Sequence, residues 1–183
     1  MRLYLIRHPE PTGASGICYG RTDLPAPPSA LDSLATRVRA VGPFDRCLTS
    51  PLSRCESLAR RLADDVIVDA RLTEINFGAW EGLPWDSIDR ADFDHWADDY
   101  VNRRVPGGES WADVRDRAES FLDDLRASSN DRVAVVTHAG VIRAVLAIVL
   151  GIALEPTWRV AVPFGCVVTI ELATPDRLIS ITE

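Results

Sequence analysis

The sequence predicts an α/β fold of three layers, with helices on both faces of a mostly parallel central sheet. Two short segments, residues 2–6 and 132–137, are almost continuously apolar, which is typical of strands buried on both faces of a parallel sheet. Strand-like and helix-like segments alternate along most of the chain. The chain has 183 residues and is 46% hydrophobic, enough for one sizeable core but short for two. We therefore expect a single domain over residues 1–183.

The first part of the chain alternates between strands and helices around one long loop. Residues 9–28 form this loop, because they are rich in Pro, Gly, Ser and Thr, and it is longer than an ordinary connection. Ser50 and Pro51 are residue types that begin helices. The other elements expected here are a first strand over residues 2–6, a helix over about 29–41, a strand over 45–49, a helix over 52–63 and a short strand over 66–68.

The middle of the chain departs from this alternation. Residues 72–82 are irregular, and residues 85–104 mix Trp, Asp and Arg in a weakly amphipathic helical pattern. We expect these segments to form a small helical cap over the sheet, inserted at about residues 77–108.

Regular elements return after the break at residues 106–108. Ser110, followed three residues later by Asp113, predicts the start of a helix that ends near Ser128. The remaining elements expected are a strand over residues 132–137, a helix over 141–150 and short strands over 160–162, 166–172 and 178–182.

Composition and charge exclude several classes of function. The net charge is −7 and the basic residues are dispersed, which argues against nucleic acid or an anionic membrane surface as a partner. The longest apolar stretch, residues 141–154, is interrupted by Arg143 and is shorter than a bilayer span. The four cysteines lack a metal-ligand spacing, so we expect free thiols, a reducing compartment and no metal site. The expected location is cytoplasmic.

Two of the three histidines end the two buried strands. His8 follows the strand over residues 2–6, directly after Arg7, and His138 follows the strand over residues 132–137. The carboxyl ends of parallel strands meet at one edge of the sheet, where ligands bind in open α/β folds. Arg54, one turn into a helix that follows a third strand, can point into the same crevice.

This set of side chains suits a phosphoryl group. A guanidinium group can bind two phosphate oxygens at once, and a neutral imidazole can attack phosphorus directly. We therefore expect Arg7 and Arg54 to bind phosphate and His8 to attack, with its other ring N–H held by a backbone carbonyl of the following loop. His138 is expected to be protonated, and Ala139, at a helix start, allows backbone N–H groups to approach phosphate closely.

Four motifs in order resemble the histidine phosphatase superfamily, and they span nearly the whole chain. They are Leu5–Ile6–Arg7–His8, Thr49–Ser50–Pro51–Leu52–Ser53–Arg54, Leu72–Thr73–Glu74–Ile75–Asn76–Phe77–Gly78–Ala79–Trp80–Glu81–Gly82 and Val136–Thr137–His138–Ala139–Gly140–Val141–Ile142–Arg143. The resemblance implies that His8 becomes phosphohistidine, that Arg7, Arg54 and His138 form the phosphate pocket, and that no metal or other cofactor takes part. The family usually continues with Gly–Glu–Thr after Arg–His, where this chain has Pro9–Glu10–Pro11, so an amide contact from residue 9 is lost.

The resemblance further implies that Glu74 donates a proton to the leaving alcohol. A bound phosphate dianion and burial would raise the pKa of such a carboxyl, so that it stays protonated and can act as an acid. Glu81 and Glu10 are alternatives for this role.

A loop segment points to the substrate. Residues 17–25 resemble the Cys–Tyr–Gly–Arg–Thr–Asp stretch of alpha-ribazole phosphatases of cobalamin biosynthesis, a branch of the same family. On this resemblance Tyr19, Gly20 and Arg21 contact the leaving group, with Asp23 as a further polar contact and Glu10 beside them. Some of Trp80, Trp85, Trp96 and Trp111 are expected to line an aromatic wall over the substrate, although most of them suit the core.

Three functions remain open on the sequence. The first is hydrolysis of a small phosphomonoester such as alpha-ribazole 5′-phosphate, and the second is a broad sugar-phosphate or phosphoglycerate phosphatase. The third is a catalytically weak phosphoester-binding module, for which Pro9 and Pro11 are the reason. Mutase action is less favoured, because mutases of this family generally have longer chains. The partner expected is a small phosphorylated metabolite, and the sequence is compatible with a homodimer.

Overall fold

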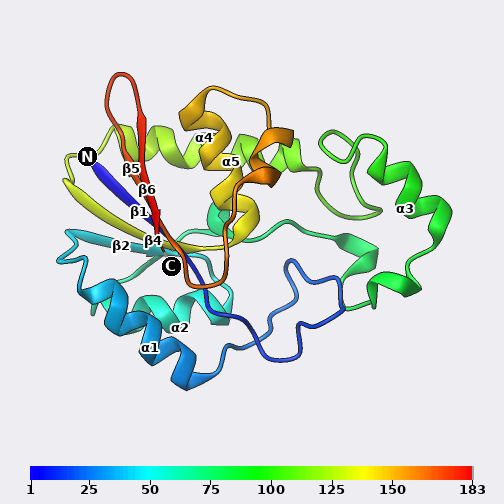
Figure 1. The fold of residues 1–183 in the computed structure, drawn as a ribbon, viewed down its shortest axis with the longest axis horizontal. Coiled ribbons are helices and arrows are strands. Elements are labelled where there is room, and N and C mark those ends of the chain that lie inside the picture. Colours follow the sequence, from blue (N-terminus) through cyan, green and yellow to red (C-terminus); the bar gives the residue numbers. More distant parts are fainter. Residues whose placement is uncertain (183) are drawn as a thin grey trace.

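A computed structural model describes residues 1–182 and contains one six-stranded sheet in the order β3-β2-β4-β1-β5-β6 (Figure 1). The strands are β1 (Arg2–Arg7), β2 (Arg46–Thr49), β3 (Ile67–Val68), β4 (Arg132–Thr137), β5 (Val167–Glu171) and β6 (Arg177–Thr182). The first four of these are parallel to one another, and β5 and β6 are antiparallel to their neighbours. The structure confirms the predicted mostly parallel α/β sheet.

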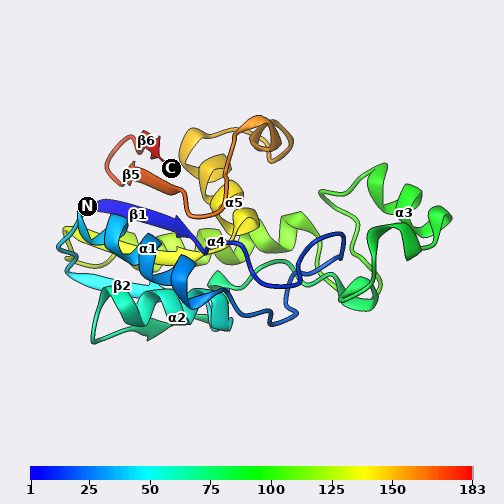
Figure 2. The same cartoon turned by 60° about the horizontal axis from the view of Figure 1, so that its bottom comes forward.

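Helices cover both faces of this sheet. The helices are α1 (Pro28–Arg39), α2 (Ser53–Leu62), α3 (Arg90–Ala97), α4 (Trp111–Arg126) and α5 (Ala139–Leu150). The pair α1 and α2 lies on one face, and α4 and α5 lie on the other (Figure 2). Strand β1 explains the continuous apolar run in the sequence: Leu3 and Leu5 pack under α4 and α5, while Tyr4 and Ile6 pack against α1 and α2.

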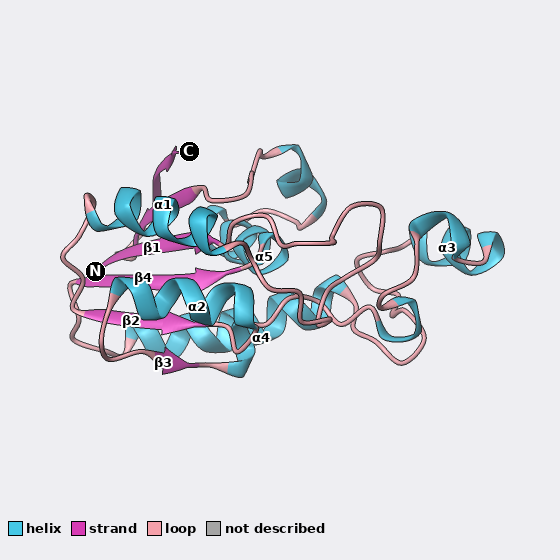
Figure 3. Ribbon diagram, turned by 90° about the horizontal axis from the view of Figure 1, so that it is seen from below, coloured by secondary structure: helices cyan, strands magenta, loops and turns pink. Residues whose placement is uncertain are grey.

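The segment around α3 projects beyond the carboxyl ends of the strands (Figure 3). Its two ends meet at a narrow stem, where the amide of Ala79 donates to the carbonyl of Pro106 and that of Glu109 to the carbonyl of Asn76. Gly78 has φ +50° there, and a Cβ on it would come within 2.2 Å of the Pro106 oxygen. The stem therefore requires glycine at this position.

The weakly amphipathic helical pattern of residues 85–104 corresponds to two short helices. The segment contains a short 3₁₀ helix, Trp85–Ser87, and then α3, which is only eight residues long. The carboxylate of Asp89 accepts from the amides of Ala91 and Asp92 and so begins α3. Of the aspartates in this segment, Asp89 caps α3, whereas Asp94 pairs with Arg90 on the surface of the helix.

The strand predicted over residues 160–162 is wrong. A 3₁₀ helix, Glu155–Arg159, precedes this segment, and the segment itself is irregular. The carbonyls of Val160 and Val162 accept from the guanidinium groups of Arg143 and Arg7 instead of from a neighbouring strand. In contrast, the start predicted at Ser110 is confirmed, because Ser110 and Asp113 form a reciprocal capping box.

No helix within residues 1–182 is long and apolar enough to cross a membrane.

Candidate active site

Three strand ends bring the predicted phosphate-binding residues together. His8 follows β1, Ser50 follows β2 with Arg54 in the first turn of α2, and His138 follows β4 and caps α5. The rings of His8 and His138 face each other edge to face, with 4.9 Å between their centroids. Because β1, β4 and β2 are neighbouring parallel strands, these side chains share one edge of the sheet.

His8 is held in the form that a nucleophile requires. Its Nδ1–H donates to the carbonyl of Pro9 at 2.7 Å, so Nε2 carries no proton, and its lone pair accepts a hydrogen bond from the Nε–H of Arg54 at 3.3 Å. Burial, with the charges of Arg54 and Arg7, lowers the pKa of His8 to about 3, so the ring is neutral near pH 7. The predicted carbonyl partner is thus supplied by Pro9, a residue that has no N–H to offer.

Arg54 is fully buried and its orientation is set by a loop rather than by a carboxylate. Its two terminal nitrogens donate to the carbonyls of Gly20 and Thr22, at 2.7 and 2.9 Å. No ion pair joins Arg54 to a carboxylate anywhere in residues 1–182. Its positive charge is therefore not neutralised by a protein partner.

Arg7 is positioned by the segment that was wrongly predicted as a strand. Its guanidinium donates to the carbonyl of Val162 and lies 3.7 Å above the ring centre of Phe164. Its Nε is buried and has no hydrogen-bond partner. A buried unpaired donor beside His8 suits a ligand that brings hydrogen-bond acceptors, as a phosphate does.

His138 is placed as predicted, but its environment does not favour the protonated form that we expected. Its Nε2 lies 2.8 Å from Oγ of Ser50 and 3.4 Å from Sγ of Cys55, and the ring is completely buried. Burial, followed by electrostatic interactions with His8 and with arginines that include Arg54, lowers the pKa of His138 well below its ordinary value. The protein alone therefore keeps this ring neutral, and only an added anion would favour its imidazolium.

Glu74 lines the cavity and contacts the first turn of α5. Its carboxylate accepts from the amide of Gly140 at 3.2 Å and from that of Ile75 at 3.1 Å. A Cβ on Gly140 would come within 2.3 Å of this carboxylate, so glycine is required for the contact. Ala139 and Gly140 line the same cavity as Glu74 and His8, and the amide of Gly140 is already used by Glu74.

The rival carboxylates are placed differently. Glu81 accepts from the amides of Arg21, Thr22 and Phe77, at 2.8 to 2.9 Å. Burial opposes its ionisation, but hydrogen bonds from the Thr22 side chain and from backbone amides outweigh burial and lower its pKa. Glu81 is therefore an ionised acceptor with no proton to donate, and Glu10 is exposed and does not line the cavity.

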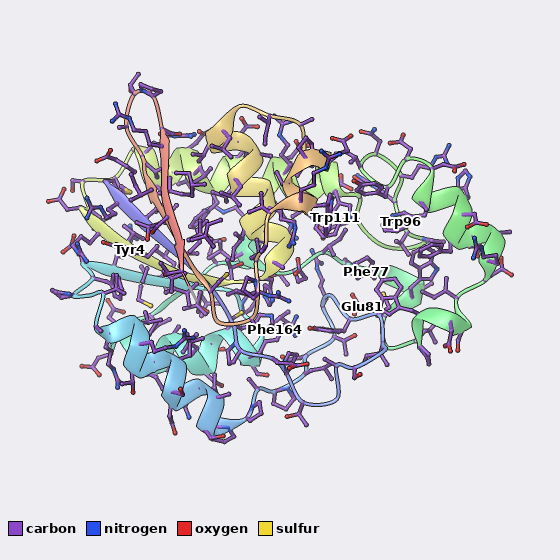
Figure 4. All side chains as sticks on the ribbon, viewed as in Figure 1. Tyr4, Phe77, Glu81, Trp96, Trp111 and Phe164 are labelled. Atoms are coloured by element: carbon purple, nitrogen blue, oxygen red, sulfur yellow. The ribbon has the colours of Figure 1, made fainter. Side chains whose placement is uncertain are left out.

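The cavity beside His8 has a volume of about 430 Å³ and is bounded mainly by aromatic side chains. They are Tyr19, Phe77, Trp85, Trp96, Tyr100, Trp111 and Trp158. In Figure 4, Phe77, Trp96 and Trp111 lie on the side of the cap, and Phe164 lies nearer to the sheet. Three of the four tryptophans considered in the sequence are in this wall, whereas Trp80 is 4% exposed and belongs to the core. Sequence reasoning missed Tyr100 and Trp158, because nothing in their local pattern connects them with the phosphate site.

Comparison with known protein families shows which family the chain belongs to. Residues 3–180 match the histidine phosphatase superfamily (branch 1). This chain is a histidine phosphatase. The family accounts for the histidine pair at the strand ends, and it makes the protein an enzyme of the phosphatase class.

Relatives of this histidine phosphatase differ in the substrates that their names specify. The adenosylcobalamin/alpha-ribazole phosphatase of Escherichia coli is 29% identical over 178 residues, which cover 91% of this chain and 87% of that protein. Phosphoserine phosphatase 1 of Hydrogenobacter thermophilus is 32% identical over 131 residues, which cover 67% of this chain and 60% of that protein. A crystal structure of the alpha-ribazole phosphatase from Shigella flexneri superimposes with a TM-score of 0.88 at 26% identity, over 100% of this chain and 96% of that one.

The predicted substrate loop of this histidine phosphatase divides into two parts. Tyr19 lines the cavity, and its ring centre lies 5.4 Å from the guanidinium carbon of Arg54. Gly20 does not line the cavity, and Arg21 turns away and pairs with Glu109 at 3.1 Å. Asp23 accepts from the amide and hydroxyl of Ser53 and so begins α2. Only Tyr19 of this loop is therefore placed to touch a leaving group.

Within residues 1–182, no three His, Cys, Asp or Glu side chains come together as a metal ion would require.

Proposed function

We propose that this histidine phosphatase hydrolyses a phosphomonoester through a phosphohistidine on His8. The observation that carries the proposal is the hydrogen bond from Nδ1 of His8 to Pro9, which leaves Nε2 unprotonated and accepting from the Nε–H of Arg54, whose charge no carboxylate neutralises. A neutral imidazole with one free nitrogen is the state in which histidine is a nucleophile.

The reaction proceeds in two displacements. Nε2 of His8 attacks phosphorus, the bond from phosphorus to the alcohol oxygen breaks, and Glu74 transfers a proton to that oxygen. Water then attacks the phosphohistidine, giving its proton to Glu74, so that inorganic phosphate leaves and His8 is neutral again. Arg7 and Arg54 neutralise the charge that collects on the phosphoryl oxygens in both steps.

We propose alpha-ribazole 5′-phosphate as the substrate. Its alcohol carries a ribose and a flat, mainly apolar benzimidazole ring, which suits an aromatic wall. The cavity volume of about 430 Å³ lies in the range of sites that hold ligands of this size. The likeness to the alpha-ribazole phosphatases of Escherichia coli and Shigella flexneri, and the resemblance of residues 17–25, support the same choice.

Phosphoserine and phosphoglycerate fit this cavity less well. Both carry a carboxylate beside the phosphate, which needs a cation of its own. Among the described residues that line the cavity, the charged side chains are Arg7 and Glu74, with His8 neutral. Arg143 lies close by, but its guanidinium lies over Trp158 and donates to the carbonyls of Ala139 and Val160. A second carboxylate would therefore be left without a partner.

The test is steady-state turnover with chelator present, for alpha-ribazole 5′-phosphate, phosphoserine, 3-phosphoglycerate and ribose 5-phosphate. We expect the ribazole ester to have the highest kcat/KM, by about tenfold or more, since an aromatic contact adds roughly 1–2 kcal/mol. Equal turnover of all four would point to a broad phosphatase. No turnover, together with binding of orthovanadate, would point to a phosphoester-binding module.

A further inference from the structure

We propose that Glu81 is the positioning residue of the phosphate clamp, acting on Arg54 through the peptide group that joins Gly20 to Arg21. The inference rests on the proposed function, because it assigns a purpose to the clamp at Arg54. It concerns a carboxylate that touches neither the cavity nor His8.

The first link joins Glu81 to the loop. One carboxylate oxygen accepts from the amide of Arg21 at 2.8 Å, and the other accepts from the amides of Gly20 and Thr22 at 3.0 and 2.9 Å. The hydroxyl of Thr22 donates to the same carboxylate. Three successive amides are therefore turned toward one anion, and their carbonyls are free to point elsewhere.

The second link joins the loop to Arg54. The carbonyl of Gly20 and the N–H of Arg21 belong to one planar peptide group, in which they point in opposite directions. That N–H donates to Glu81 and that carbonyl accepts from Arg54 at 2.7 Å. An anion on one side and a guanidinium on the other polarise the same amide, which strengthens both hydrogen bonds.

The third link joins Arg54 to His8, where its Nε lies 3.3 Å from the attacking nitrogen. A carboxylate in direct contact with Arg54 would hold it equally well, but it would compete with phosphate for the same donors. Anchoring through a carbonyl fixes the direction of the guanidinium and leaves its charge for the substrate. This accounts for a buried arginine whose hydrogen-bond partners within residues 1–182 are the carbonyls of Gly20 and Thr22 and the ring of His8.

Two further observations concern the packing of the loop and the charge of Glu81. A Cβ on Gly20 would come within 1.8 Å of the carbonyl oxygen of Ile75, so the loop is pressed against the chain that leads to Glu81. The pKa of Glu81 is lowered, because hydrogen bonds from Thr22 and the amides outweigh the effect of burial. The carboxylate is thus charged at neutral pH, as the polarised amide requires.

Glu109 offers a matched control. It is another partly buried carboxylate at the cap stem, and it accepts from the amide of Asn76 at 2.9 Å. It pairs with the side chains of Arg21 and Arg117 rather than with the loop amides. Glu109 therefore supports the same region without a hydrogen-bonded path to Arg54.

The experiment is a double-mutant cycle with Glu81→Gln and Arg54→Ala. We measure kcat and KM for p-nitrophenyl phosphate and the inhibition constant of orthovanadate, with thermal unfolding of every variant. We expect Glu81→Gln to weaken orthovanadate and lower kcat/KM by about tenfold when Arg54 is present, and by less than about twofold in Arg54→Ala. Glu109→Gln is expected to change both backgrounds by the same factor.

The outcomes separate this inference from the proposed function. An equal loss from Glu81→Gln in both backgrounds would show a merely structural role and overturn the inference. If Arg54→Ala changes neither kcat/KM nor the inhibition constant of orthovanadate, Arg54 does not bind phosphate, and the proposed function fails with it. If Glu81→Gln does not fold, Thr22→Val replaces it, because it removes only the hydroxyl donor. Its effect must likewise depend on Arg54 for the inference to stand.

Discussion

The two ends of the cavity are built in different ways. At the phosphate end, residues at the ends of β1, β2 and β4 are buried and fixed by hydrogen bonds to backbone carbonyls and to neighbouring side chains. At the leaving-group end, the lining comes from the cap and from the 3₁₀ helix at residues 155–159, and its side chains contact one another mainly as aromatic rings. Trp85 and Trp158 are 41% and 40% exposed there, whereas His8 is 2% exposed.

This difference separates chemistry from selectivity. Hydrogen bonds to the backbone fix the position and orientation of a side chain. A nucleophile and the arginines that bind phosphate must be placed to within a fraction of an ångström. Aromatic contacts are less directional and tolerate side chains of other shapes. Changes at the phosphate end should therefore abolish turnover of every substrate, and changes at the aromatic end should alter the order of substrates.

The largest effect is expected for His8→Ala. It removes the atom that accepts the phosphoryl group, so turnover of all substrates should fall by about a thousandfold or more. Rapid quenching with radiolabelled substrate should give an acid-labile phosphoenzyme in the native protein and none in the variant. His95→Ala, which removes an exposed histidine on α3, is the control. Persistence of the labelled enzyme in His8→Ala would place the phosphoryl group elsewhere.

Glu74→Gln tests the group that lies between the two ends. Only a poor leaving group needs a proton, so hydrolysis of an alkyl phosphate should slow by about a hundredfold, and that of p-nitrophenyl phosphate by less than about fivefold. Glu10→Gln, at an exposed carboxylate outside the cavity, should change neither rate. Equal slowing of both substrates would remove Glu74 from the role of acid.

Trp158→Ala should affect selectivity alone. Trp158 contacts Trp111 edge to face at 4.9 Å between ring centres, and its loss removes part of the aromatic wall. We expect kcat/KM for alpha-ribazole 5′-phosphate to fall by about tenfold, with ribose 5-phosphate changed by less than about twofold. Ile179→Ala, on an exposed side chain of β6, is the control. A similar loss for both substrates would show that the wall supports the phosphate end.

The last effect concerns stability against pH rather than turnover. The pKa of His8 is about 3 in the folded protein, below its ordinary value of 6.5, so the unfolded chain binds more protons between these values. The contribution of His8 to the free energy of unfolding is therefore fully present above about pH 6.5 and is lost at lower pH, by up to about 1.4 kcal/mol per pH unit. Denaturation by urea at several pH values should show a smaller slope in His8→Asn. His95→Asn should keep the native slope, and an unchanged slope in His8→Asn would contradict the buried neutral state.

The same division explains what the sequence could predict. The sheet and the histidines at its strand ends were predictable, because a strand buried on both faces leaves a continuous apolar run and parallel strands end at one edge. Tyr100 and Trp158 were not, because their place in the wall depends on how the cap and residues 155–159 fold back in space. Glu81 was considered only as an acid, since its hydrogen bonds to a loop about sixty residues earlier leave no local pattern.

Charge states also lay beyond the sequence. We expected a protonated His138 from its position at the start of a helix facing phosphate. The ring is instead enclosed by Ser50 and Cys55 with positive groups nearby, and burial dominates its pKa. Such a result follows from the sum of the surroundings in three dimensions, which no spacing of residues encodes.

The closed stem of the cap has a consequence for the history of this fold. Because residues 76 and 109 are hydrogen-bonded to each other, the segment between them begins and ends at the same place in the structure. If the segment between these residues is lengthened, shortened or replaced, the distance between residues 76 and 109 stays the same. A change in this segment can therefore alter which leaving groups fit, while the sheet and His8 stay as they are.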